Sequence, residues 1–168
     1  FGTHFNQPLG NALVVCTALT HINFGNGFNC PLDNSLHNCI ALTHINFGIH
    51  FNQPLDFTLD NCTSLVHLGL GFCFDQKLNL PYNIRSLSLD SNNGNYGDYL
   101  PNTIEELELG ENFNLELDNL PSTIKKITFD KYIDYNKELN CLPQGLSILQ
   151  LPSEYNLQIQ NIPKSLTK

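Results

Sequence analysis

Three histidines recur at a constant interval in the first half of the sequence. His21, His44 and His67 are evenly spaced, and each lies two residues after a leucine. If the segments that carry them stack as parallel strands, their imidazole rings lie about 5 Å apart. Imidazole nitrogen is a zinc ligand, but a zinc site usually needs four ligands that converge on one point. A ladder of parallel side chains brings two together at a time, so duplication of a repeat explains the histidines and we expect no bound metal.

Two glutamates form a second candidate for chemistry. Glu106 and Glu108 lie two residues apart, so an extended strand would place both on one face. In glycosidases such a pair works only when the carboxyl groups oppose each other across a cleft. Here Lys126 follows Glu106 one repeat later, and Lys125 follows Glu105 at the same interval. This spacing predicts ion pairs between neighbouring strands rather than a catalytic pair.

Three of the six cysteines, Cys16, Cys39 and Cys62, recur at the same interval as the histidines. Their shared orientation is poor disulfide geometry, because bridged cysteines need Cβ atoms that face each other. We therefore predict small thiols buried on the side opposite the strands. The other cysteines share no position, and no C-x-x-C motif occurs. Cysteines without paired spacing favour a reducing compartment, which predicts a cytoplasmic location.

Motifs typical of enzymes are missing from the sequence. It holds no G-x-S-x-G nucleophile motif and no phosphate-binding glycine-rich loop before a helix. No histidine follows His67, and the repeat determines the positions of the three that recur. We expect neither enzymatic activity nor a cofactor.

The segments that must position these residues are copies of one short repeat. LTHINFG occurs at 19–25 and again at 42–48. Related L-x-x-[IL]-x-[FL] segments follow at intervals of roughly 20 residues, a period typical of solenoid repeats. The copies begin at Leu19, Leu42, Leu65, Ile84, Ile104, Ile124 and Leu146. Alternating apolar and polar residues in each copy predict a short strand. Because strands that recur at this interval cannot pair as hairpins, we expect a solenoid of parallel strands.

A second element, F-N-x-x-L, follows each predicted strand. It occurs at 5–9, 28–32, 51–55, 74–78 and 113–117, with looser copies at 135–139 and 155–159. We expect the aromatic residues to stack inside the solenoid and the asparagines to bond backbone groups where the chain turns. Both roles are structural.

The segments that return to the next strand are of two kinds. Residues 1–80 carry repeats of about 23 residues with a cysteine, in which Asp33–Cys39 could form a helical turn. Residues 81–168 carry repeats of about 20 to 22 residues with a Leu-Pro or Ile-Pro pair, and proline disfavours helix in the preceding residue. The later repeats should therefore be thinner, and helix content low. One copy departs from the pattern, because Asn93 and Gly97 replace its core anchors. We expect 91–99 to bulge as a mobile loop, either through drift or as a binding loop.

These residues resemble two related repeat types. F-N-x-x-L followed by L-P-x-x-[IL] is similar to the FNIP repeat, a leucine-rich-repeat variant of slime moulds and giant amoeba viruses. The cysteine-bearing copies resemble leucine-rich repeats of bacterial and protist surface proteins. The resemblance implies one leucine-rich-repeat solenoid domain over 1–168, with seven to eight parallel strands on its concave face. It also implies recognition of another protein.

In such proteins an F-box often precedes the repeats and recruits host ubiquitin ligase, but the sequence holds none. Phe1 aligns with Phe24, in mid-repeat, and Leu166 begins a strand that the chain does not finish. We therefore expect a chain truncated at both ends relative to its repeat.

Charge and hydropathy limit the classes of partner. The net charge is -8, which argues against nucleic acid, since phosphate binding needs clustered Lys and Arg. No apolar run approaches the roughly 20 residues of a membrane-spanning helix. Residues 81–120 carry eight acidic residues against Arg85. Such a segment is either a solvated face or a surface for a basic partner.

The outward strand positions are therefore the expected binding surface. They are His21, Asn23, His44, Asn46, His67, Ser86, Ser88, Asp90, Glu106, Glu108, Lys126, Thr128, Asp130 and Gln150. We expect a partner protein to contact them, and a viral or host-directed recognition role is one version of this function. In that case the location would be the host cytoplasm. The alternative is a structural solenoid, for example of a virion, that associates with itself end to end.

Overall fold

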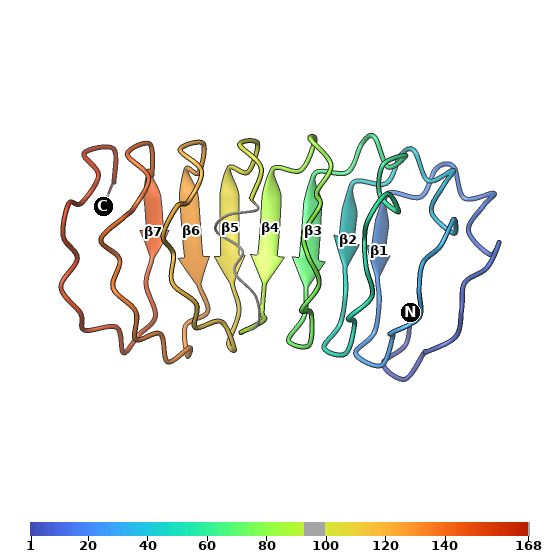
Figure 1. Ribbon diagram of the computed structural model, residues 1–168, viewed down its shortest axis with the longest axis horizontal. Coiled ribbons are helices and arrows are strands. Elements are labelled where there is room, and N and C mark those ends of the chain that lie inside the picture. Colours follow the sequence, from blue (N-terminus) through green and yellow to red (C-terminus); the bar gives the residue numbers. More distant parts are fainter. Residues whose placement is uncertain (93–99, 168) are drawn as a thin grey trace.

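Seven short strands form one parallel sheet in the computed structural model, which describes residues 1–92 and 100–167. The strands are β1 (His21–Asn23), β2 (His44–Asn46), β3 (His67–Leu70), β4 (Ser86–Leu89), β5 (Glu106–Leu109), β6 (Lys126–Phe129) and β7 (Ile148–Gln150). Their spatial order is their order in the sequence, and every neighbouring pair is parallel (Figure 1). Each strand with its return segment is one rung of a solenoid. The predicted fold is confirmed, and no helix occurs among the described residues.

The register of the sheet follows the repeat. His21 pairs with His44 and His44 with His67, so equivalent residues of successive copies lie side by side. The pairing continues from Ser86 to Glu106 and from there to Lys126. The return segments absorb all the variation in repeat length, so the strand register is unchanged where that length changes.

The core lies between the strands and the return segments and contains two kinds of ladder. One consists of the inward strand residues, such as Ile45 and Leu68, which are fully buried. The other consists of the aromatic residues of F-N-x-x-L. Phe28, Phe51 and Phe74 stack with centroid separations of 6.0 and 6.2 Å. This confirms the predicted internal aromatic ladder.

Asparagines form the next ladder, as predicted from their place beside the aromatic residue. The Asn29 side-chain oxygen accepts hydrogen bonds from the Asn52 backbone N–H at 2.8 Å and from the Gln53 amide at 3.0 Å. Asn52 in turn accepts a hydrogen bond from the Asp75 N–H at 2.9 Å. Each asparagine thus satisfies a backbone donor of the following rung, which holds successive turns together.

A glycine follows the strand in the early rungs, where the backbones of neighbouring rungs approach closely. A Cβ atom built on Gly48 would lie 2.5 Å from the Gly25 carbonyl oxygen, and one on Gly71 would lie 2.3 Å from that of Gly48. No side chain fits at this separation, which explains the recurring glycine of LTHINFG.

The return segments differ between the two halves, as predicted. In the first half, the segment after Leu32 forms successive turns, with bonds from the Ser35 N–H to the Leu32 carbonyl and from the Cys39 N–H to the Leu36 carbonyl. The expected helical turn over Asp33–Cys39 is therefore a run of tight turns. In the second half, a single proline turn suffices, such as that from Pro101 to Ile104. The later return segments are shorter for this reason.

Two further expectations concern the ends of described segments. The predicted loop over 91–99 lies outside the described residues except for Ser91 and Asn92, and Ser91 is buried with its hydroxyl donating to the Phe74 carbonyl at 2.8 Å. The backbone N–H of Thr167, beside Leu166, donates to the Ser147 carbonyl at 3.1 Å, but no strand is formed there.

Within the described residues, no helix has the length and hydropathy to cross a membrane.

Candidate functional site

The strand face is the surface made by the outward positions predicted above, and the structure brings all of them onto the exposed side of the sheet or directly after its strands. They form two columns. The first column runs from the histidines through Ser86 and Glu106 to Lys126. The second column begins with Asn23 and Asn46. In the second column, Ser88, Glu108, Thr128 and Gln150 are neighbours in register. Asp90 and Asp130 follow β4 and β6 directly.

The histidine ladder occupies the amino-terminal end of the strand face. The rings of His44 and His67 lie 5.4 Å apart, and His67 also contacts Ser86 and Asn46 through its two ring nitrogens, at 2.9 and 3.1 Å. Burial lowers the pKa of His67, an effect that Glu108 opposes and His44 reinforces. Burial lowers the pKa of His44 as well, and the neighbouring His21 adds to the shift. His44 and His67 are therefore predominantly neutral at pH 7.

The histidine rings stack in a row and do not converge on one point. Each of them faces another ring or a neutral hydrogen-bond partner. Among the described residues, no group of three or more His, Cys, Asp or Glu side chains is placed to hold a metal ion.

Ion pairs dominate the next part of the strand face and its edge. Lys125 lies 2.6 Å from Glu105, and Lys126 lies 3.4 Å from Glu106. Both predicted pairs between rungs are confirmed. The hydrogen bond from Lys125, with its positive charge, lowers the pKa of Glu105, and Arg85 at 3.9 Å adds to this effect. Glu106 is therefore already paired, whereas Glu108 has no cation beside it within the described residues.

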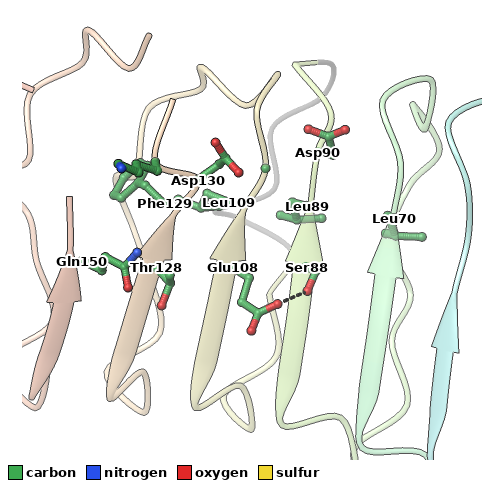
Figure 2. A pocket seen from close by; sticks show the side chains of 12 residues that line it. Leu70, Ser88, Leu89, Asp90, Glu108, Leu109, Thr128, Phe129, Asp130 and Gln150 are labelled. Atoms are coloured by element: carbon green, nitrogen blue, oxygen red, sulfur yellow. Dashed lines mark hydrogen bonds between the residues drawn. The ribbon is translucent and has the colours of Figure 1, made fainter. Parts of the chain in front are cut away.

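A hollow of about 460 Å³ opens on the strand face where β3 to β6 end (Figure 2). Its apolar lining comes from the last residue of each of these strands, namely Leu70, Leu89, Leu109 and Phe129. Its polar lining includes Ser88, Glu108, Thr128 and Gln150 from the second column. Apolar walls with a few polar groups are typical of sites that bind a ligand or an inserted side chain.

The hollow is acidic. Asp90, Glu108 and Asp130 line it together with one lysine, Lys131. Two of the carboxylates have structural roles: Asp90 accepts the Asn112 backbone N–H at 2.9 Å, and Asp130 accepts that of Tyr132 at 2.8 Å. Glu108 accepts the Ser88 hydroxyl at 2.7 Å and supports no backbone group of the described chain. It is therefore the carboxylate best placed to meet a partner.

One polar atom in this hollow lacks a hydrogen bond. The Thr128 hydroxyl is inaccessible to solvent and has no partner among the described residues. A buried hydroxyl without a partner costs free energy unless another molecule satisfies it. Thr128 lies between Glu108 and Gln150 in register, and its hydroxyl is enclosed by the chain.

The sequence pattern places the polar candidates correctly on one face but does not show the hollow. Alternation along each strand predicts a core position for strand-end residues such as Leu109, and they do lie in the core. They also line the hollow, next to Gly110, where a Cβ atom would lie 2.5 Å from a side-chain oxygen of Asp90. The repeat pattern carries no signal for this hollow.

The cysteine ladder lies on the opposite side of the core. Cys39 and Cys62 are buried as predicted, whereas Cys16 is only half-buried, and all six cysteines are free. Burial raises the pKa of Cys62 to about 11, and Cys39 adds to the shift. A thiol held protonated in this way is a poor nucleophile, which agrees with the predicted packing role.

The fold and this surface define a repeat solenoid related to leucine-rich-repeat proteins. The FNIP Repeat family model matches residues 97–132. Among solved structures, CroV588, described as a novel circular LRR protein, is similar to this chain with 28% identity and a TM-score of 0.59 over 90% of the chain. The chain spans 26% of that protein, about a quarter of its length. No curated protein sequence matches the chain. The resemblance to FNIP and leucine-rich repeats is thereby confirmed.

Proposed function

We propose that the chain is a non-catalytic recognition module whose strand face binds a basic segment of a partner protein. The observation that carries this proposal is the acidic hollow, in which Glu108 has no cation beside it among the described residues. A lysine or arginine side chain supplies both a positive charge and hydrogen-bond donors. Its aliphatic stem would lie against the apolar lining.

The area around the hollow supports the same role. Solenoids bind partners over several rungs at once, because each rung presents equivalent outward positions. The second column offers Ser88, Gln150 and the Asn46 amide on either side of the acidic centre. We infer that a basic side chain is anchored at Glu108 while polar contacts along this column determine which partner is accepted.

A role without catalysis follows from the same geometry. The outward groups are ladders of like residues, such as the stacked histidines, and their acids other than Glu108 form ion pairs or accept backbone bonds. The His67 ring contacts the Ser86 hydroxyl at 2.9 Å, but its other ring nitrogen meets the Asn46 amide oxygen at 3.1 Å, where a catalytic triad would have a carboxylate. We propose binding alone, with neither a cofactor nor a metal.

Affinity capture with charge-reversed variants tests this proposal. The chain would be immobilised in three forms and exposed to an extract of the cells that produce it, and recovered proteins compared by quantitative mass spectrometry. Glu106→Lys with Glu108→Lys should lose the specific partner at least tenfold. The control, Glu116→Lys with Glu154→Lys, changes the net charge equally at sites outside the hollow and should retain it. Equal recovery on all three forms would contradict the proposal.

A further inference from the structure

Phe57 combines two features that folding does not explain. Its side chain is 83% exposed, and its backbone has a φ of 59°, in the left-handed region. Large side chains rarely adopt this conformation, which asparagine tolerates. Asn119 and Asn161, which follow the F-N-x-x-L element at the same distance in later rungs, have φ values of 59° and 55°. Phe57 thus places an aromatic ring in solvent where the fold accepts asparagine.

Tyr82, in the next return segment, departs from its repeat in the same way. It directly follows Pro81 and is 87% exposed. The residue after the proline in the later copies is polar in every case: Asn102, Ser122, Gln144 and Lys164. Two aromatic residues on neighbouring rungs therefore replace polar residues at exposed positions. Exposed aromatic residues gathered in this way are typical of surfaces that bind another protein.

Both residues line one groove of about 840 Å³. Its other apolar walls are Leu78, Leu80, Pro81 and Pro101. The groove lies where the repeat changes length, between the run of turns after Leu55 and the single proline turn at Pro81.

The groove is separate from the strand-face hollow. It includes Arg85, which directly precedes β4, whereas the hollow includes Asp90, which directly follows that strand. The two sites therefore lie at opposite ends of the strands. Among the described residues, none lines both.

The charge of the groove indicates what it binds. Asp56 and Asp60 line it, and neither forms an ion pair within the described residues. Arg85 lines it as well, but its guanidinium faces Glu105 at 3.9 Å and donates to the Tyr82 carbonyl at 3.0 Å. An occupant with positive charge would therefore meet two uncompensated carboxylates beside the aromatic rings.

We propose that this groove is a second docking site, which binds an extended protein segment with an apolar side chain next to lysine or arginine. The apolar side chain packs against Phe57, Tyr82 and the leucines, and the basic side chain pairs with Asp60 or Asp56. Aromatic rings also attract the cationic side chains of such a segment. The chain then holds two partners, or two parts of one partner, at opposite ends of its strands.

Selection of random twelve-residue peptides displayed on phage, with the chain immobilised, tests this proposal. Enriched peptides should share an aromatic or aliphatic residue beside Lys or Arg. Their synthetic copies should bind at least tenfold more weakly to Phe57→Asn and to Tyr82→Ser, which carry residues found at the equivalent positions. The control Tyr132→Ser removes a tyrosine that is 79% exposed elsewhere and should change the affinity less than twofold. Acidic enriched peptides, or equal binding to all variants, would overturn the proposal.

Two further measurements separate partner docking from loss of folding and from self-association. Phe57→Asn should keep or raise the midpoint of thermal unfolding, because asparagine suits the left-handed backbone, so lost binding would not reflect unfolding. Sedimentation of the chain alone should show a monomer. A dimer that disappears in Phe57→Asn would assign the groove to a second copy and overturn the proposal. Glu106→Lys with Glu108→Lys should leave peptide binding unchanged, which separates this site from the strand face.

Discussion

The imidazole rings of His21 and His44 stack with their centroids 4.4 Å apart and their planes 7° from parallel. The two residues belong to successive copies of the repeat and lie directly opposite each other in the sheet. This pair shows the register of the sheet, in which equivalent residues of successive copies lie side by side. It also places His21 where its charge lowers the pKa of His44.

Stability should therefore fall as the histidine ladder is protonated. The pKa values of His44 and His67 are lowered in the folded chain, so the unfolded chain binds more protons below about pH 6.5. Their contribution is present at neutral pH and is lost as the pH falls through the folded pKa values. Urea unfolding at pH 7 and pH 5.5 should show a smaller loss of unfolding free energy in His67→Gln than in the parent chain. An equal loss in both would contradict the role of His67.

Removal of one lysine should change the titration of Glu105. The hydrogen bond from Lys125 is the main cause of its lowered pKa. Lys125→Met should raise the pKa of Glu105 toward the ordinary value, as followed by carboxyl NMR shifts during an acid titration. Lys126→Met is the control, because Lys126 pairs with Glu106 instead. A similar shift in both variants would show that the general charge of the sheet, not the pair, sets this pKa.

The loss of unfolding free energy on removal of an aromatic ring should depend on whether that ring belongs to the buried ladder. Phe51 is fully buried between Phe28 and Phe74, with the Phe47 ring centroid 3.8 Å from its own. Phe51→Ala should lower the unfolding free energy by about 3–5 kcal/mol, since it leaves a cavity. Phe57→Ala removes an exposed ring and should change it by about 0.5 kcal/mol or less. Chemical denaturation measures both, and similar losses would show that Phe57 supports the fold.

The stability that an asparagine of the ladder contributes should depend on its side-chain oxygen as a hydrogen-bond acceptor. The Asn52 oxygen accepts bonds at 2.9 Å from the Asp75 N–H and from the Gln76 amide. Asn52→Ala should cost about 1–2 kcal/mol of unfolding free energy, because it removes the acceptor of both bonds. Asn52→Asp keeps an acceptor and should cost less. Hydrogen exchange at the Asp75 amide should quicken only in the alanine variant.

Much of the fold could be predicted because the repeat itself determines register. Two successive copies of LTHINFG align His21 with His44 without any knowledge of the return segments. The ion pair between Glu106 and Lys126 follows in the same way. These features depend only on position within the copy.

The strand-face hollow and the groove could not be predicted, because each depends on contacts between copies of the repeat that differ in sequence. The acidic hollow is lined by residues of several rungs, and the unsatisfied Thr128 hydroxyl depends on its side-chain orientation. The groove at Phe57 and Tyr82 lies where a longer repeat is followed by a shorter one. Its signal is nevertheless present in the sequence, as aromatic residues where other copies carry polar ones.

Binding at the strand face is tested most directly by mapping the bound partner onto the chain. Isotope-labelled chain would be titrated with the protein recovered by affinity capture, and backbone amide signals followed by NMR. We predict the largest shifts at Ser88, Glu108, Thr128 and Gln150, around the acidic hollow. Shifts confined to the return segments, with these four amides unchanged, would contradict a partner site on the strand face.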